Sequence, residues 1–451
     1  MTRGVRIPAS VAVTLMVILS AAFGGAQNGP ATPLRLTLED AIHRGLQANL
    51  GVLVAETRRQ EAMGTAERSR SLLLPRLRIA IPATIQSQSL AAEGISVPGL
   101  PLPQVVGPYS VYDARAFADL PIVDMQLWHG LRAARQSTAA TKEDYQDARD
   151  LVIRDVAALY LSAQSEFAEV VAAESRVDTA QALYKLAAEQ RDAGVATGID
   201  VLRAQVQLAN ERQSLVQSRN RAKGSLLTLA RNIGMSPGID LALADPLAFH
   251  PVHSIIVETV LPQALVSRPD YQSLLRQRDA LNEQLRASRA RFLPRLTASG
   301  NYGGIGRTLG SINATEVAQL SLSFTVFDRD REGEAAQITA RIQRIERQMN
   351  DARLGVEQEL RQALLDLDSA AEEVTVAGAG LDLAQKELDL AQLRFSEGVT
   401  NNVEVVTAQD ALSRAQQNSI VALTHHADAR ISLARALGNT EASYAEYLGS
   451  R

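Results

Sequence analysis

The residues of this chain that could do chemistry are few, and they do not converge on one site. The close histidine pairs are His250 with His253, and His425 with His426. Adjacent side chains on a helix point about 100° apart, so one metal ion cannot readily take both His425 and His426. His250 and His253 lie in a proline-rich stretch, which favours a surface loop over a ligand pair. The absence of cysteine excludes disulfides, thiolate metal sites and cysteine catalysis.

A glycine-rich segment at 302–306 has the composition of a phosphate-binding loop but not its context. It lies between two expected strands, whereas a phosphate loop must open a helix. We therefore interpret Tyr302-Gly303-Gly304-Ile305-Gly306 as the turn of a β-hairpin. The sequence predicts no enzyme, no metal site and no cofactor.

The composition indicates long helices and argues against a nucleic-acid partner. The formal net charge of the 451-residue chain is −4, whereas nucleic-acid binding requires a basic footprint. Aromatic residues make up only 4%, while alanine, leucine, glutamine, arginine and glutamate are plentiful. That bias is typical of proteins built from long helices.

The first residues have the order of a secretory signal peptide, which we place at 1–26. Arg3 and Arg6 precede an apolar run from Val11 to Ala22, and small residues follow. The alternative is a membrane anchor, but a spanning helix needs roughly 20 apolar residues. No later segment offers such a stretch. We expect a secreted protein whose membrane attachment, if any, does not use transmembrane helices.

The chain contains an internal repeat. Leu74-Pro75-Arg76-Leu77 recurs as Leu293-Pro294-Arg295-Leu296, an offset of 219 residues. From Asp124 and Asp328 onward the offset is 204, and Gly194-Val195 recurs at that spacing as Gly398-Val399. The first copy therefore carries an insertion after Pro75, which includes the Pro/Gly-rich loop Val97–Pro103. We divide the chain into a first repeat (27–235), a linker (236–268), a second repeat (269–438) and a C-terminal tail (439–451).

Each copy is expected to end in a very long helical hairpin. Leu131 to Ala193 contains neither glycine nor proline, and as a helix it would reach roughly 95 Å. Apolar or small residues recur along it at near-heptad spacing, which predicts helices packed lengthwise. The second copy runs from about Glu334 to Glu397. Glycines end both helices, so we place the hairpin tips at about 193–200 and 397–403, with Asp200 or Asn402 capping the returning helix.

Four segments of about ten residues have the alternation of β-strands. They cover about 76–92, 109–123, 295–306 and 315–327, and apolar and polar residues alternate along them, less cleanly in the second. This length and pattern are typical of transmembrane strands, although two hairpins on a soluble core would look the same. Four strands leave open edges, which lipid does not permit. We therefore expect two or more chains to share one barrel.

These motifs together resemble the TolC-like outer-membrane efflux protein family. The resemblance runs from about Leu36 to Gly438. It rests on two helix-to-strand junctions, Ser71–Leu77 and Ala290–Leu296, and on two tip motifs, Gly194 to Leu202 and Gly398 to Val406. It implies a mainly α fold with a β-barrel part: a homotrimer with a twelve-stranded barrel in outer-membrane lipid and a twelve-helix tunnel across the periplasm. It also implies a mixed segment midway, a periplasmic adaptor protein and an inner-membrane pump.

The resemblance also indicates where a gate and a docking surface would lie. An acidic residue just after the second tip lines the family's constriction, and the matching position is Glu404. The second acid often found there is replaced by Thr407. We hypothesise that Glu404 forms a threefold ring, and that Asp200 and Arg203 make inter-hairpin contacts. The alternative is that Asp200 only caps a helix and Glu404 is solvated. Adaptor docking is expected at the tip residues, which are Gly194, Val195, Thr197, Gly398, Val399 and Asn401.

Three functions are compatible with the sequence. The first is a passive channel for efflux of small molecules, and the second is the outer-membrane partner of type I protein secretion. The third, from a different class, is a periplasmic adaptor or structural coiled-coil protein, which the duplicated hairpins disfavour. The sequence does not name the cargo.

Overall fold

The computed structural model describes residues 34–90, 92–94, 103–251, 255–400, 402–438 and 440–441. The expected signal peptide, most of the loop Val97–Pro103 and most of the C-terminal tail lie outside these ranges. The elements follow in the order β1 (Leu34–Leu36), α2 (Leu38–Ala48), α3 (Leu50–Ser71), β2 (Arg76–Ala80), β3 (Ala83–Ser89), β4 (Val105–Val123), α4 (Met125–Asp192), α5 (Gly198–Asn232), β5 (Leu241–Leu243), α6 (Val257–Ser267), α7 (Pro269–Arg289), the 3-10 turn η1 (Ala290–Phe292), β6 (Arg295–Gly306), β7 (Asn313–Ser323), α8 (Asp330–Ser396) and α9 (Asn402–Ala436).

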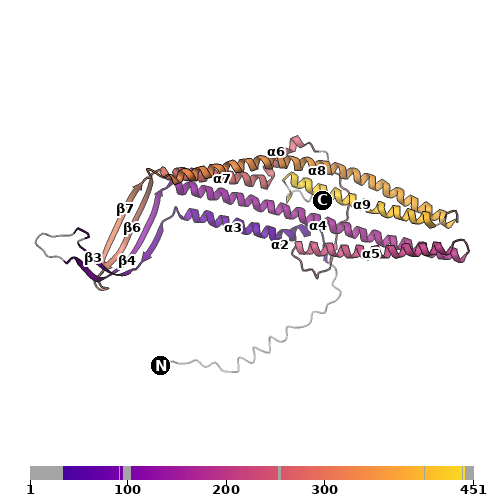
Figure 1. Ribbon diagram of the computed structural model, residues 1–451, viewed down its shortest axis with the longest axis horizontal. Coiled ribbons are helices and arrows are strands. Elements are labelled where there is room, and N and C mark those ends of the chain that lie inside the picture. The colour runs from indigo at the N-terminus through magenta and orange to yellow at the C-terminus, as the bar shows by residue number, and fades with distance from the viewer. Residues whose placement is uncertain are drawn as a thin grey trace, which may run out of the picture.

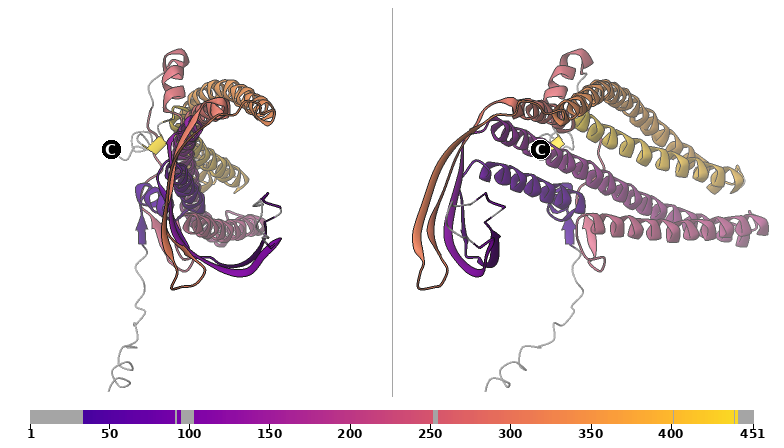
Figure 2. Two further views of the ribbon diagram at one scale, coloured as in Figure 1. Left: turned by 90° about the vertical axis from the view of Figure 1, so that its left-hand side faces the viewer. Right: turned by 60° about the vertical axis from the view of Figure 1, so that its left-hand side comes forward.

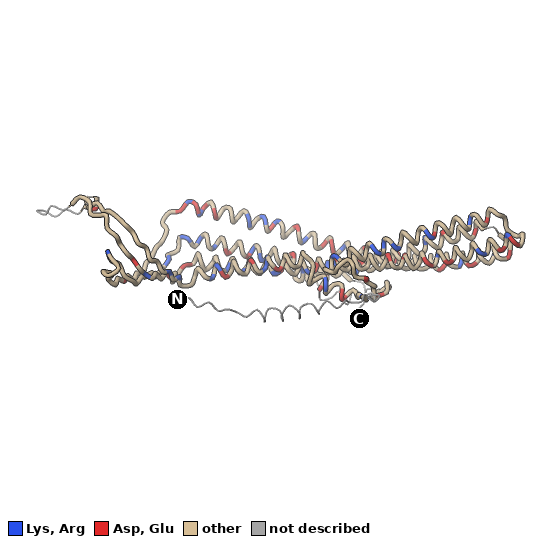
Figure 3. Tube along the Cα trace, turned by 90° about the horizontal axis from the view of Figure 1, so that it is seen from below, with Lys and Arg blue, Asp and Glu red and all other residues tan. Residues whose placement is uncertain are grey.

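The molecule is long and narrow, with a β-sheet at one end and two helical hairpins at the other (Figure 1). The sheet and the helices curve in the same direction, like a section of the wall of a tube (Figure 2). Charged residues of both signs follow the helices, whereas most of the sheet carries neither sign (Figure 3). Within the described ranges, no helix combines the length and apolar character needed to cross a membrane.

The helix α4 runs for 68 residues between two local signals. The Asp124 carboxylate accepts a hydrogen bond from the Leu127 amide at 3.0 Å, which caps the start. The helix ends at Asp192, and Gly194, just beyond its C-cap, has a φ of +77°, which favours glycine. Its counterpart α8 is 67 residues long and passes through Gly355, Gly378 and Gly380 without a break, because packing against α9 and α7 outweighs the weak helix propensity of glycine.

Small and apolar residues hold the helices together. Of the near-heptad positions in α4, Val152, Val156, Ala163, Ala173 and Ala180 are buried. Near the tips, one apolar cluster takes residues from all four long helices, among them Leu183, Val201, Phe395 and Val405. The four helices of the two hairpins are therefore packed together at the tips, rather than lying as two separate pairs.

The first edge of the sheet is formed by β2 and β3, which together pair antiparallel with β4. Ala80 lies opposite Arg115, and Ala83 lies opposite Tyr112, so the register continues unchanged across the break. Pro82 interrupts the ladder because it has no N–H to donate. The prediction of one unbroken strand from 76 to 92 is therefore wrong at Ile81–Pro82 and beyond Ser89.

Two other strand predictions need correction. The strand β7 ends at Ser323 rather than at 327, because Ser323 pairs with Arg295, the first residue of β6, where the ladder between the two strands ends. The segment Tyr302–Gly306 is not a turn but the end of β6. A Cβ at Gly303 would lie 2.0 Å from the Ala114 carbonyl oxygen, so the glycine is needed for close strand contact. The strand β4 also begins earlier than expected, at Val105, because β3 extends its ladder.

Midway along the helices, the N-terminal segment and the linker join. The strands β1 and β5 pair in parallel, and the Tyr160 hydroxyl on α4 donates to the Leu36 carbonyl oxygen at 2.9 Å. Glu441, near the other terminus, forms an ion pair with Arg149 of α4. Within the linker (236–268), residues 257–267 form α6. Pro262 lies inside that helix, which therefore lacks one backbone N–H donor at this position.

Candidate functional site at the helical tips

The first tip, between α4 and α5, is held by a capping box. Gly194 ends α4, and the amides of Val195 and Ala196 donate to the Gln190 carbonyl oxygen at 2.9 and 3.2 Å. Thr197 then starts α5: its amide and hydroxyl donate to Asp200 Oδ2 at 3.0 and 2.6 Å. These bonds hold the pKa of the Asp200 carboxyl below its usual range. The tip is therefore a preorganised turn.

The second tip, between α8 and α9, has the same Gly stop but a different start. Gly398 has a φ of +70°, and the Val399 amide donates to the Arg394 carbonyl oxygen at 2.9 Å. Asn402, the first residue of α9, is almost fully buried. Its neighbour Asn401, a predicted docking residue, lies outside the described residues.

Hydrogen bonds between described residues join the tips within one chain. The Asn402 side-chain amide donates to the Asp200 carbonyl oxygen at 3.0 Å. The Gln190 side-chain amide donates to the Phe395 carbonyl oxygen, also at 3.0 Å. The bonds connect residues about two hundred positions apart, so relative motion of the two hairpins at this end must break or stretch them.

The structure places Glu404 on the first turn of α9, in contact with its own hairpin. Its carboxylate forms an ion pair with Arg394 of α8 at 3.1 Å, and it accepts a hydrogen bond from the Thr400 hydroxyl. Its side chain remains about two-fifths exposed. The Thr407 hydroxyl donates to the Val403 carbonyl oxygen at 2.9 Å, one turn back on the same helix. Any ring of Glu404 side chains would thus carry a cation beside each carboxylate.

Asp200 and Arg203 act on their own helix in this chain. Their side chains form an ion pair at 3.7 Å, three residues apart on α5, and Arg203 is half exposed. The contact between hairpins runs through the backbone carbonyl of Asp200 instead. Thr197 is the N-cap of α5, and Asp200 is the third residue of the helix, whose carboxylate completes the capping box. Asn402, the other residue predicted to be a cap, is the first residue of α9. An inter-hairpin role for the side chains of Asp200 and Arg203 stays a prediction.

An apolar groove beside the tips was not predicted. It has a volume of about 420 Å³ and lies between the starts of α5 and α9. Exposed Ile199, Leu202 and Val206 line one side, and Val403 lines the other. The signal was present, because Ile199, Leu202 and Val206 recur at helical spacing on a different face from buried Val201, Ala204 and Leu208. An amphipathic helix is expected to have one apolar face, whereas α5 has two.

The predicted docking residues are largely exposed at the far end of the molecule. Val195 and Val399 expose 65% and 69% of their surface. A Cβ added at Gly398 would lie 3.7 Å from a Val195 methyl carbon, so the tips are near neighbours. The two valines therefore form a small apolar surface at the end of the helices.

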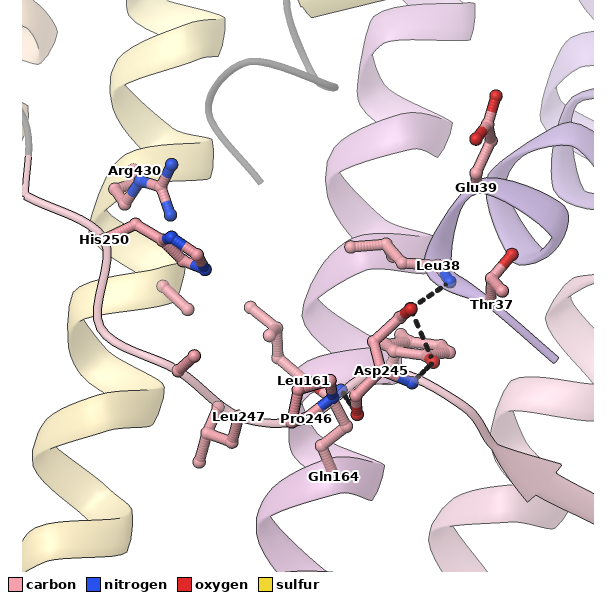
Figure 4. Close-up of a pocket in the computed structure, with 13 residues that line it drawn as sticks. Thr37, Leu38, Glu39, Leu161, Gln164, Asp245, Pro246, Leu247, His250 and Arg430 are labelled. Carbon is pink, nitrogen blue, oxygen red and sulfur yellow. Dashed lines mark hydrogen bonds between the residues drawn. The ribbon is translucent and has the colours of Figure 1, made fainter. Parts of the chain in front are cut away.

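A second cavity lies midway along the helices, and its polar lining is mostly bonded within the chain. It has a volume of about 370 Å³. Asp245 Oδ2 accepts a hydrogen bond from the Leu38 amide at 2.7 Å. It also lies 2.9 Å from the Tyr160 hydroxyl, whose single proton it shares with the Leu36 carbonyl oxygen. His250 and Arg430 lie across from Asp245 (Figure 4). This arrangement fastens the linker to α2 and α4.

The two adjacent histidines diverge as expected. His425 is exposed and contacts Glu373 at 3.3 Å. His426 is buried, with its ring 4.6 Å from that of Phe249. The pair faces two different environments, which suits structural roles.

A model of the outer membrane efflux protein family matches residues 41–235 and 260–439, which is most of the chain. The chain belongs to that family. The two matched ranges correspond to the two helical repeats, and the unmatched residues between them lie in the linker.

Named relatives of this efflux family member are similar over part of their length. The toluene efflux pump outer membrane protein TtgC of Pseudomonas putida is 26% identical over 301 residues, which cover 64% of this chain and 60% of that protein. The pyoverdine export outer membrane protein OpmQ of Pseudomonas aeruginosa is 25% identical over 70% of this chain and 68% of that protein. This chain thus aligns with about three fifths of the length of TtgC.

Solved structures share the fold of this efflux family member over nearly all its length. The outer membrane protein VceC of Vibrio cholerae superposes with a TM-score of 0.75 at 18% identity, covering 89% of this chain and 96% of that one. The CmeC outer membrane channel of Campylobacter jejuni gives 0.76 at 16% identity, covering 89% and 86%. The predicted architecture of a sheet joined to paired long helical hairpins is confirmed at the level of the fold.

Proposed function

We propose that this protein is the outer-membrane channel subunit of an export system and acts as a passive conduit. The observation that carries the proposal is the sheet, one face of which exposes large apolar side chains. Leu77, Ile79, Leu320 and Leu322 lie on that face and are more than three-fifths exposed. An apolar face of this kind is costly in water and stable in lipid.

The open edges of the sheet support a closed assembly of several chains. Among the residues that the structure describes, neither the β2–β3 edge nor the β7 edge has a partner strand. In lipid each unpaired backbone group costs several kcal/mol, so the edges must pair with those of other chains. We propose a homotrimer with a shared twelve-stranded barrel. The curved helical wall then continues the barrel as a tunnel through the periplasm, and the channel serves export without catalysis.

The names of the relatives support a proposal for the cargo. The names of the relatives refer to toluene and to pyoverdine, which are small molecules rather than proteins. We therefore propose small-molecule efflux together with a periplasmic adaptor and an inner-membrane pump. We propose the tips as the adaptor-docking surface, because Val195 and Val399 are apolar at an exposed end and the groove lined by Ile199 and Leu202 adjoins them.

A gate at the tips is part of the proposal. Glu404 would form a threefold acidic ring, and its ion pair with Arg394 would moderate the charge of that ring. The two intrachain links, from Asn402 and Gln190, would hold the hairpins of each chain in the closed arrangement. The preorganised first tip supports a fixed closed geometry.

The test is the behaviour of the purified mature protein. We expect it to require detergent, to sediment as a trimer, and to open ion-conducting channels in planar lipid bilayers. Deletion of the gene should sensitise cells to small hydrophobic compounds, and the wild-type chain should restore resistance. A water-soluble monomer recovered from the periplasm, with no channel activity, would refute the proposal. Loss of a secreted protein in the deletion strain, without sensitisation, would favour type I protein secretion.

A further inference from the structure

The two faces of the sheet have opposite chemistry, and the register assigns each residue to a face. Large apolar side chains occupy one face, as described above. The other face carries six of the seven charged residues of the sheet, which are Arg76, Arg78, Asp113, Arg115, Asp119 and Arg295. If the apolar face meets lipid, this polar face lines the lumen.

The charges on the polar face are not evenly distributed. Arg115 lies near the middle of β4 and is engaged by Asp113, with Arg115 Nε 2.6 Å from Asp113 Oδ1. That pair leaves no net charge. A Cβ at Gly303, opposite Arg115, would lie 2.6 Å from Arg115 Cγ, so the glycine makes room for the arginine on the wall.

The remaining arginines gather where the strands leave the helices. Arg76 and Arg295 are the first residues of β2 and β6, and Arg78 is the third residue of β2. Within the described part of the chain, no ion pair involves any of the three. Arg78 instead lies over the Phe117 ring, 4.7 Å from its centroid, and cation–π contact keeps its full charge.

One acidic residue lies in this group. Asp119 is opposite Arg76 in the register. Three arginines against one aspartate leave two positive charges per chain, and therefore six in a trimer. Like charges gathered around a narrow lumen with low-dielectric walls produce a potential that is larger than the same charges produce on an open surface.

We propose that Arg76, Arg78 and Arg295 form a basic ring at the helix-proximal end of the barrel lumen, and that this ring favours the passage of anions. The inference rests on the proposed channel function and adds a specificity-determining element to it. The ring lies at the opposite end of the helices from Glu404, so the two elements act on cargo in succession. The two rings have opposite charge: the ring at the tips is acidic, and the ring at the helix-proximal end of the barrel is basic.

The experiment measures the reversal potential of the trimer in planar bilayers under a potassium chloride gradient. Changing the three arginines to glutamine should lower the chloride-to-potassium permeability ratio about threefold or more near 0.1 M salt, since one kT of potential alters local ion concentration by about that factor. The Debye length falls from about 10 Å at 0.1 M to about 3 Å at 1 M. The difference between variant and wild type should therefore shrink at 1 M.

Two further variants control for structure. Arg78→Lys keeps the charge and should keep most of the chloride preference. Arg307→Gln makes the same chemical change just beyond the far end of β6, where Arg307 lies over the Tyr109 ring at 5.4 Å, and should leave the ratio unchanged. Channels of normal conductance whose ratio is unaltered in the triple variant would overturn the basic ring. A wild-type protein that forms no channel would overturn the proposed function instead.

Discussion

The link between the two tips gives the most direct prediction for gating, through Asn402→Ala. In each chain the substitution removes the bond from the Asn402 amide to the Asp200 carbonyl oxygen. The Gln190–Phe395 bond would remain. We expect the closed arrangement to weaken, because any opening that separates the hairpins of one chain has to break this bond.

The size of the effect follows from the burial of the bond. A hydrogen bond of this kind contributes about 1 kcal/mol net. Asn402 is buried, so water does not readily take the place of its amide as donor. Three copies in a trimer lose about 3 kcal/mol together if they open as a unit. Since 1.4 kcal/mol is a factor of ten, the ratio of closed to open channels should fall roughly a hundredfold.

The assay is the open probability of single channels in planar bilayers. Gln385→Ala is the matched control: it removes an amide that donates to Asp389 within α8, so it should not affect gating. A stable Asn402→Ala trimer with the open probability of the wild type would show that the tip link does not hold the channel closed. An equal rise in the Gln385→Ala control would point to a general loosening of α8.

Three further predictions concern the tips and the middle of the molecule. Glu404→Gln should reduce cation preference and divalent block, whereas Arg394→Gln, which frees the carboxylate, should increase both; unchanged conductance properties in both variants would exclude the acidic ring. Val195→Asp and Val399→Asp should abolish export while trimers remain in the membrane, and normal export from them would exclude docking there. Burial lowers the pKa of His426 to about 4. As pH falls below about 6.5, the unfolded chain therefore binds a proton at this histidine before the folded chain does. This difference lowers the free energy of unfolding by up to about 3 kcal/mol between pH 7 and 4. In His426→Asn that part of the pH dependence should be absent, as measured by urea unfolding.

The sequence predicted the helices well because their signals are local. The absence of glycine and proline from 131 to 193, and the glycines at 194 and 398, fix where α4 and α8 can run and where they end. The N-cap itself was misplaced, because Thr197 holds that position and Asp200 completes the capping box from the third residue of α5. The strands were located by alternation, but their ends depend on partners, so Ser89 and Ser323 were missed.

The links between distant segments could not be predicted in this way. Nothing local to Asn402 indicates that its amide reaches a carbonyl in the other repeat. The pairing of Glu404 with Arg394 depends on how closely α8 and α9 approach at their tip. The second apolar face of α5 was also missed, because a sequence pattern does not say which of two faces is covered.

The sequence by itself determined that this chain contains two repeats, each with a long helical hairpin and amphipathic strands. Helix length, helix ends and side-chain alternation are set by residues a few positions apart. Only the tertiary structure decided which distant residues meet. These contacts are the tip link, the register that places Arg76, Arg78 and Arg295 on one face, and the contact of Tyr160 with Asp245 in the linker. The physical reason is that such contacts depend on packing between segments far apart in the chain, which no local preference specifies.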